Sequence, residues 1–183
     1  MSACSSSDDT GASGGAANQA GAGNASSGGS SSSGDVEPPE QSGMTAAHNA
    51  VRANVRPAAN PAIPPLVWSG AVAATAQAWA DHCTFEHSGG KFGENIYATA
   101  GAPSSPAKVV GSWADEAEQY DYASNSCTDV CGHYTQVVWR NSARLGCGVS
   151  NCTKNSPFSG FSQWQFWVCN YDPPGNFNNQ KPY

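Results

Sequence analysis

The sequence predicts a mixed α/β domain of the α+β class, built in layers. Segments around residues 45–56, 69–83 and 105–120 carry apolar side chains at the spacing of a helix. Residues 163–171 form a strand candidate that is apolar on both faces, as in a central strand covered on both sides. Helices that precede a covered sheet indicate a layered fold and exclude a β-barrel or a helix bundle.

The first 42 residues have the composition of a disordered segment. They contain 12 Ser, 8 Gly and 7 Ala, five acidic residues, and no basic or aromatic residue. Such a chain cannot bury enough apolar surface to offset its ordering entropy, so we expect a flexible tether over residues 1–42 and one folded domain over residues 43–183. Five of the six net negative charges lie in this tether. The domain is nearly neutral, which excludes the basic surface of a nucleic-acid-binding protein.

Two helices are expected in the first part of the domain. Thr45 is an N-cap residue for the first, which ends before Pro57 and is followed by a proline-rich loop over residues 57–65. Ser69 is in position to cap the second, which ends near Cys83. The apolar stripes are Ala47, Val51 and Val55 in the first helix, and Val72, Ala76, Trp79 and Cys83 in the second.

A glycine-rich turn over residues 86–93 separates these helices from a third. Ser105 and Pro106 provide the N-cap and the first-turn proline that favour a helix start. The inward stripe of this helix consists of Val109, Trp113, Glu116 and Tyr120. Glu116 is therefore expected either on the same face as two aromatic side chains or at the solvent-exposed edge of that face.

The segment His133–Trp139 is compatible with a strand or a short helix, because its hydrophobic pattern fits both. Residues 144–151 and 163–171 are clearer strand candidates. In the second of these strands the two apolar faces consist of Trp164, Phe166 and Val168, and of Trp167, Cys169 and Tyr171. We therefore expect this strand in the middle of the sheet.

Seven cysteines occur in the chain, and Cys4 is the only one in the tether. The other six lie in the domain, which indicates three disulfides formed in an oxidising compartment, with a pairing that sequence alone leaves open. A zinc ribbon would require two Cys-x-x-Cys pairs. The spacings of Cys127 with Cys131 and of Cys147 with Cys152 do not provide them.

The residues Met1–Cys4 resemble the end of a bacterial lipoprotein signal, in which small residues precede a lipidated cysteine. Lipidation of Cys4 is one interpretation, and a free thiol without a role is the other. With lipidation, the domain is extracellular or attached to the cell envelope, as in an outer-membrane lipoprotein, and reaches the membrane only through this anchor. No other stretch of the sequence is long and apolar enough to span a bilayer.

Several motifs together resemble those of one family. The longest is Gly132–Trp139, which reads Gly-His-Tyr-Thr-Gln-Val-Val-Trp and is followed by Leu145–Gly148. The others, in chain order, are His48–Asn49 with Arg52, His87–Ser88 with Gly93–Asn95, Trp113 with Glu116, and Cys169–Asn176. From Met44 to Tyr183 the domain thus resembles the CAP superfamily of cysteine-rich secretory proteins, antigen 5 and pathogenesis-related proteins of group 1, and the plant pathogenesis-related branch in particular.

The resemblance implies an α-β-α sandwich around a three-stranded antiparallel sheet. It also implies three disulfides, which would join Cys83 with Cys152, Cys127 with Cys131, and Cys147 with Cys169. In a central cleft it would bring together His87, Glu94, Glu116 and His133.

Two imidazoles and two carboxylates in one place support three interpretations. His87 and His133 can hold Zn²⁺ or another divalent metal, with water or a carboxylate completing the site. Alternatively, the histidines and glutamates can act as general acid and base. The third interpretation is a hydrogen-bonded structural cluster that fixes the glycine-rich turn to two helices.

Two main functional hypotheses follow. In the first, the domain is a monomeric binding module for a sterol, a fatty acid or another apolar ligand, as the resemblance implies for several family members. In the second, it is a metal-assisted hydrolase with Glu94 or Glu116 as the base. We expect binding rather than turnover, because the domain cysteines are expected to be oxidised and the sequence has no His-Glu-x-x-His motif. A third hypothesis is a host- or envelope-interaction domain that releases a C-terminal peptide after Asn170–Asp172.

Overall fold

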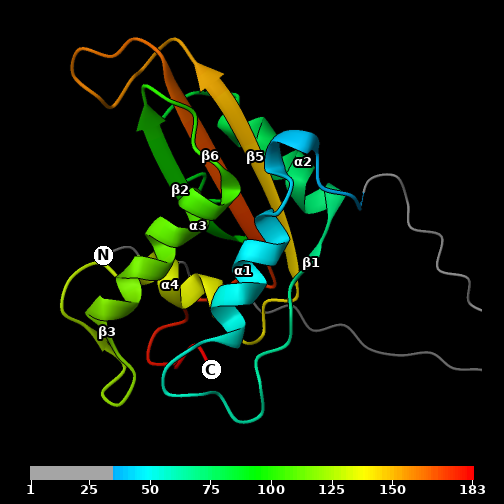
Figure 1. Cartoon of the computed structure of the whole chain (residues 1–183), viewed down its shortest axis with the longest axis vertical. Helices are drawn as coiled ribbons and strands as arrows, with labels where there is room; N and C mark the ends of the chain where they lie inside the picture. The colour runs from blue at the N-terminus through cyan, green and yellow to red at the C-terminus, as the bar shows by residue number, and fades with distance from the viewer. Residues whose placement is uncertain (1–34) are drawn as a thin grey trace, which may run out of the picture. The chain divides into compact units, whose positions relative to one another are not determined.

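The computed structural model describes residues 35–183 (Figure 1). Most of the expected tether, including Cys4, lies outside the described residues. The α-helices are α1 (Met44–Ala53), α2 (Gly70–Ala80), α3 (Pro106–Ala114) and α4 (Gly132–Val137), and the 3₁₀-helices are η1 (Pro39–Gln41) and η2 (Asp115–Gln119). The strands are β1 (Val67–Trp68), β2 (Gly93–Ala100), β3 (Tyr120–Asp121), β4 (Ser126–Cys127), β5 (Arg144–Cys152) and β6 (Trp164–Asp172). In this part of the chain, no helix has both the length and the apolar character needed to cross a membrane.

The main sheet has four strands in the order β1-β5-β6-β2. Its strands β5, β6 and β2 are antiparallel neighbours, which confirms the three-stranded antiparallel core. As expected, β6 lies between two other strands and is buried on both faces. The short strand β1 runs parallel to β5 at the edge of the sheet. Neither β1 nor β2 was predicted from the hydrophobic pattern.

Helices cover both faces of this sheet, so the fold is an α-β-α sandwich. Figure 1 shows α2 on one face, against β5 and β6, with α1, α3 and α4 packed together on the other. Among the buried residues between α2 and the sheet are Ala76, Ala80, Ile96, Phe166 and Val168. The cluster on the opposite face includes Trp113, Val137, Leu145, Trp167 and Tyr171.

Two glycines of β5 allow α2 to approach the sheet closely. A Cβ atom on Gly146 would lie 2.1 Å from the backbone nitrogen of Ala73, and one on Gly148 would lie 2.3 Å from Cα of Gln77. Both neighbours are backbone atoms of a packed helix, so rotation of a side chain cannot relieve the clash. The absence of a side chain at these two positions therefore sets the distance between α2 and the sheet.

Three disulfides join the pairs that the resemblance implies, namely Cys83–Cys152, Cys127–Cys131 and Cys147–Cys169. The first connects the segment after α2 to the end of β5, and the third joins the paired strands β5 and β6. The second lies immediately before α4, because Cys131 is the N-cap residue of that helix. The first disulfide thus links the main sheet to the α2 side, the third lies within the sheet, and the second joins the β3–β4 hairpin to the start of α4.

The buried face of α1 differs from the predicted one. Its fully buried residues are Met44, His48 and Arg52. The predicted apolar residues Ala47 and Val51 are only partly buried, and Val55 is buried beyond the end of the helix. Hydropathy does not indicate the true face, because His48 and Arg52 are polar and can be buried only when hydrogen bonds satisfy them.

The start of α1 is capped by a residue outside the helix rather than by Thr45. The carboxylate of Glu37 accepts hydrogen bonds from the backbone nitrogens of Gly43 at 2.7 Å and of Thr45 at 2.6 Å. Between Glu37 and Gly43, the 3₁₀-helix η1 buries the side chain of Gln41, which is 3% exposed. Residues 37–42, which composition assigns to the tether, are therefore part of the folded domain.

The second helix is shorter than predicted. It ends at Ala80, and Cys83 follows in a turn with a positive φ of 52°. Trp79, expected in the buried stripe, is only partly buried, while Ala73 and Ala80 are buried instead.

The third helix starts as predicted, since Ser105 Oγ accepts a hydrogen bond from the backbone nitrogen of Lys108 at 3.3 Å. It ends at Ala114, so Glu116 lies in the 3₁₀ turn η2 rather than in the helix. The ambiguous segment that begins at His133 is helical and forms most of α4.

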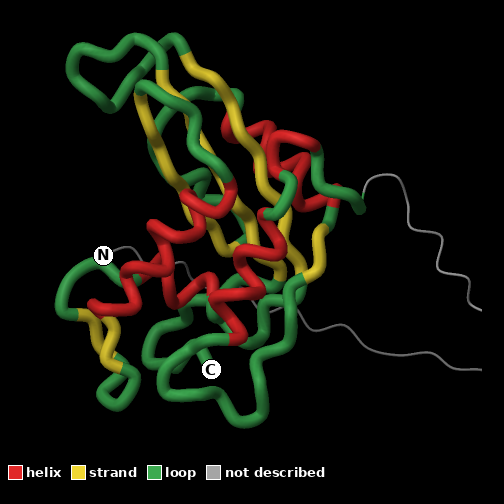
Figure 2. Tube along the Cα trace, in the orientation of Figure 1, coloured by secondary structure: helices red, strands yellow, loops and turns green. Residues whose placement is uncertain are grey.

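Two long loops, residues 54–66 and 173–183, lie together at the end of the sheet near α1 and α4 (Figure 2). Arg140 connects them: its Nη2 donates to the carbonyl oxygen of Pro61 at 2.7 Å, and its backbone nitrogen donates to that of Pro182 at 2.7 Å. The proline-rich loop therefore packs against the body of the domain, as expected.

Replacing Gly148 by Ala tests the close packing of α2. The added methyl group has no space beside Gln77, so we expect the free energy of unfolding to fall by about 1–3 kcal/mol. The matched control is Gly111→Ala in α3, where a Cβ would meet no atom within 4 Å. There alanine should stabilise the helix by about 0.5–1 kcal/mol. Urea unfolding measures both variants, and equal stabilities would contradict this account of the packing.

Candidate functional site

His87 and Glu94 form one of two histidine–carboxylate pairs in the described part of the chain. His87 lies in the loop before β2, and Glu94 is the second residue of that strand. Nδ1 of His87 lies 2.9 Å from Oε1 of Glu94, which also accepts a hydrogen bond from the backbone nitrogen of Ser88 at 2.8 Å. The hydrogen bond to Glu94 raises the pKa of His87. Burial opposes ionisation of Glu94, but the hydrogen bonds from His87 and Ser88 outweigh it and lower the pKa of Glu94.

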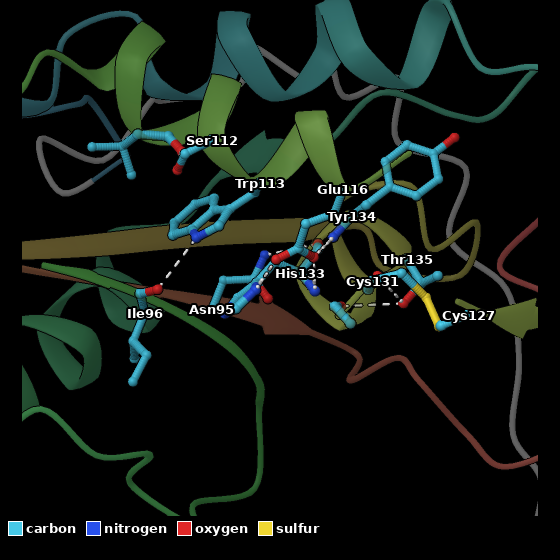
Figure 3. Close-up of polar contacts among 12 residues, drawn as sticks. Asn95, Ile96, Ser112, Trp113, Glu116, Cys127, Cys131, His133, Tyr134 and Thr135 are labelled. Carbon is cyan, nitrogen blue, oxygen red and sulfur yellow. Dashed lines mark hydrogen bonds and ion pairs between the residues drawn. A yellow bond between two sulfur atoms is a disulfide. The ribbon is translucent and has the colours of Figure 1, made fainter. Parts of the chain in front are cut away.

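The second pair joins α4 to η2 (Figure 3). Nδ1 of His133 lies 2.6 Å from Oε1 of Glu116. The other carboxylate oxygen accepts hydrogen bonds from the backbone nitrogens of His133 at 2.9 Å and Tyr134 at 3.2 Å. Glu116 thus binds both the imidazole and the first turn of α4, whose N–H groups have no partner within the helix. The ring of Trp113 stacks on that of His133, with centroids 6.2 Å apart, so Glu116 lies beside the aromatic face.

In both pairs the carboxylate fixes which imidazole nitrogen is available. When Nδ1–H donates to a carboxylate, Nε2 of the neutral ring keeps its lone pair. Histidine ligands of metals typically have this arrangement, because the carboxylate orients the ring and makes the other nitrogen a better donor of electrons. The glutamates are therefore orienting groups, and Nε2 of His87 and of His133 are the atoms that can bind a ligand or a proton.

A chain of buried hydrogen bonds connects the His133–Glu116 pair to β2, β6 and α1. Asn95 Nδ2 donates to the carbonyl oxygen of His133 and to the hydroxyl of Tyr171, both at 3.0 Å. The Tyr171 hydroxyl donates to Nε2 of His48 at 2.8 Å, and Nδ1 of His48 donates to the carbonyl oxygen of Met44 at 2.8 Å. Burial lowers the pKa of His48 to about 4, so this ring is neutral at neutral pH, as these bonds require.

The structure places the four predicted residues in two separate pairs, His87–Glu94 and His133–Glu116, rather than in one cluster. Glu94 and Asn95 are neighbours in β2, and successive residues of a strand point to opposite faces. Glu94 shares its face with Ile96, which packs in the cluster of α2, while Asn95 contacts α4. Within residues 35–183, no three His, Cys, Asp or Glu side chains are grouped so that they could hold a metal ion.

Asn95 and Tyr171 support the His133–Glu116 pair, and the sequence patterns do not predict this role. Both lie within the quoted motifs, but nothing in their spacing indicates that they connect β2 and β6 to α4. Their partners are more than 30 residues away in sequence, since Asn95 and His133 are 38 residues apart. The sequence signal available was an Asn next to Glu94, and its role cannot be recognised until the register of the sheet is known.

A mostly apolar hollow of about 330 Å³ lies beside α2, and none of the four paired residues lines it. Its apolar lining residues include Val36, Pro38, Trp68, Ala73 and Ala74. A neighbouring hollow of about 540 Å³ shares Val36 and Trp68 with it. Gln41 also lines the first hollow. In the described part of the chain, Gln41 Oε1 and Trp68 Nε1 are buried without a hydrogen-bond partner.

Comparison with known sequences identifies relatives over most of the domain. Residues 45–171 match the model of the cysteine-rich secretory protein family, CAP. Pathogenesis-related protein 1A of Nicotiana tabacum is 43% identical over 149 residues, which cover 78% of this chain and 80% of that protein. Pathogenesis-related protein 1 of Arabidopsis thaliana is 40% identical over 147 residues, which cover 78% of this chain and 82% of that protein.

Solved structures share the fold. The venom allergen-like protein 4 of Schistosoma mansoni superposes with a TM-score of 0.61 and 25% identity, over 80% of this chain and 95% of that one. A crystal structure of NaASP2 with Zn²⁺ has a TM-score of 0.61 and 23% identity, over 81% of this chain and 87% of that one. Both likenesses cover about four fifths of this chain.

The His87–Glu94 pair can be tested by titration. Replacing Glu94 by Gln removes the charge that stabilises the imidazolium, so we expect the pKa of His87 to fall towards its ordinary value. In the parent, the pair stabilises the fold at pH values below the ordinary histidine pKa, and this contribution disappears as the pH rises through the raised pKa of His87. The pH dependence of the His87 ring protons in NMR spectra measures the shift. Glu86→Gln, a neighbouring exposed change, is the control, and an identical His87 pKa in parent and E94Q would refute the pairing.

Proposed function

The chain belongs to the cysteine-rich secretory protein (CAP) family, and we propose that its domain is a binding module for an apolar ligand of the sterol or fatty-acid type. The three disulfides indicate an oxidising compartment, which agrees with a secreted or envelope-attached protein. The proposal concerns binding rather than turnover. The six cysteines of the domain are paired with one another and leave no thiol for nucleophilic catalysis.

The observation that carries this proposal is the apolar hollow beside α2. Small-molecule sites are typically concave, of about 300–1,000 Å³, and mostly apolar, with a few polar groups that orient the ligand. The hollow of about 330 Å³ has this character. Gln41 and Trp68 line it and contribute a buried acceptor and a buried donor without partners. Leaving such groups unpaired costs about 1–3 kcal/mol each, which a ligand hydroxyl or carbonyl group could recover when a side-chain rotation exposes them.

Blocking the hollow tests the proposed apolar site. Ala74 is an exposed residue of α2 that lines the hollow, so Ala74→Leu should fill part of it without disturbing the core. We expect the affinity for cholesterol or palmitate, measured through the change in tryptophan emission, to fall about tenfold, or 1.4 kcal/mol. Ala78→Leu is the matched control, since Ala78 is exposed one turn later and lies outside the hollow. Saturable binding that A74L leaves unchanged would exclude this site, and a parent that binds neither lipid would refute the function.

For the two histidines we propose a divalent cation as ligand, held by Nε2 of His87 and of His133 with water completing the coordination. His87 is exposed in the loop before β2, so binding requires this loop to bring its ring to the separate His133–Glu116 pair. The donor chemistry fits, because both rings already donate Nδ1–H to a carboxylate. In addition, Glu94 Oε2 is buried and has no hydrogen-bond partner among the described residues, so it can accept a bond from a metal-bound water. Such a cation would act as a Lewis acid and lower the pKa of bound water, which is the chemistry that the hydrolase hypothesis requires.

Calorimetric titration with Zn²⁺ tests this site. We expect one cation per chain, with binding lost in His87→Ala and in His133→Ala. His82→Ala is the control, because His82 is exposed and packs on Trp79 rather than on a carboxylate. Equal loss in all three variants, or retention in the first two, would rule out the proposed ligands. Hydrolysis that depends on both histidines would favour the metal-assisted hydrolase over a binding site alone.

The lipid anchor at Cys4 stays a prediction, since that residue lies outside the described part of the chain. Release of a C-terminal peptide after Asn170–Asp172 and a monomeric state also stay predictions. Mass spectrometry of the protein from its native host tests the anchor, because a lipidated Cys4 has a mass that the free thiol does not.

A further inference from the structure

A hollow of a different kind lies where the C-terminal segment meets α4 and the β3–β4 hairpin. Its volume is about 260 Å³, and three aromatic residues, Tyr120, Trp139 and Phe177, contribute to its lining. Side-chain amides form much of the remainder. None of the described residues that line it carries a charged side chain. It therefore differs from the apolar hollow beside α2 and from the charged histidine–glutamate pairs.

Phe177 presents an exposed aromatic ring at this hollow. Its side chain is 50% exposed, although large apolar residues are usually covered. The ring meets that of Trp139 in a T-shaped contact with centroids 5.9 Å apart. Because Trp139 is 3% exposed, it supports Phe177 from within the domain and leaves the Phe177 ring available to a ligand.

Hydrogen bonds hold the walls of the hollow in place. Asn176 accepts from the hydroxyl of Thr135 and donates to the carbonyl oxygen of Gly132, both at 2.8 Å, which ties the C-terminal segment to α4. On the hairpin side, the hydroxyl of Tyr120 donates to Oδ1 of Asn125 at 2.7 Å. The disulfide before α4 adds a covalent constraint beside them. The site is thus formed in advance, which lowers the entropic cost of binding.

Three further amides at the hollow are available to a ligand. Asn178, Asn179 and Gln180 line it and are exposed, and within residues 35–183 their side chains make no hydrogen bond. Each amide offers two N–H donors and a carbonyl acceptor. A hydroxyl group, which also donates and accepts, is the natural partner of such a set.

We propose that this hollow binds a neutral carbohydrate. A sugar ring has apolar C–H groups on its faces and hydroxyls around its edge, so one face can cover Phe177 while the hydroxyls bond to the exposed amides. The uncharged lining offers no ion pair to a phosphate, sulfate or carboxylate group, which separates this ligand class from nucleotides and acidic glycans. The inference is independent of the apolar ligand proposed for the hollow beside α2.

Titration of the full chain with maltohexaose, cellohexaose and chitohexaose tests the proposal, with tryptophan emission or calorimetry as the readout. We expect saturable binding of at least one of them. Its affinity should fall about tenfold in Phe177→Ala, which removes the stacking surface. Phe161→Ala is the matched control, since Phe161 is 52% exposed and lies outside the hollow. The double variant N178A/Q180A changes only exposed side chains and should weaken binding without affecting folding.

The salt dependence of binding distinguishes a neutral sugar from a charged ligand. Binding of a neutral sugar to an uncharged surface should not change when the ionic strength is raised. No binding of the three sugars, equal loss in F177A and F161A, or binding restricted to sulfated glycans and abolished by salt would each overturn the proposal. Binding of a peptide that is lost in Phe177→Ala, without binding of any sugar, would overturn it as well.

Discussion

The side chain of Arg52 lies at the junction of α1, α4 and the proline-rich loop, and the arrangement of the helical layer depends on it. It is 2% exposed, and its guanidinium donates five hydrogen bonds to the backbone carbonyl oxygens of Pro64, Val137, Trp139 and Ser142. All of its N–H donors are thus used. Burial lowers its pKa to about 10, so it stays charged at neutral pH, and the carbonyl dipoles at the end of α4 offset that charge.

The N-terminal end of α4 is fixed as well, and the contacts there position His133 and Glu116, one of the two pairs of the candidate site. Glu116 accepts the first N–H groups of α4, and Asn95 reaches from β2 to the carbonyl oxygen of His133. Through Tyr171 this second contact continues to the neutral, buried His48 of α1. The orientation of His133 is therefore a consequence of buried polar contacts that join three helices to the sheet. The His87–Glu94 pair depends instead on the loop before β2.

Sequence patterns predicted the elements that apolar burial decides. The strands β5 and β6, the start of α3 and the core of α2 follow from hydropathy and capping residues. Elements decided by distant polar partners were not predictable in this way. His48 and Arg52 are buried because carbonyl groups far along the chain satisfy them, and the segment after Cys131 is helical because Glu116 caps it. Motif resemblance predicted the two histidines and two glutamates of the candidate site, but not their separation into two pairs, which depends on the alternation of side chains along β2.

The most direct test of this account is amide hydrogen exchange in Arg52→Met. The change leaves four carbonyl groups without their donor, at a cost of about 1–3 kcal/mol for each buried group. We predict that the amides of Thr135 in α4 and of Val138, the C-cap residue of this helix, then exchange roughly a hundredfold faster, while Val168 in the centre of β6 is affected much less. Parent-like protection of Thr135 and Val138, or an equal loss at all three amides, would contradict the claim that Arg52 holds α4 on the sheet.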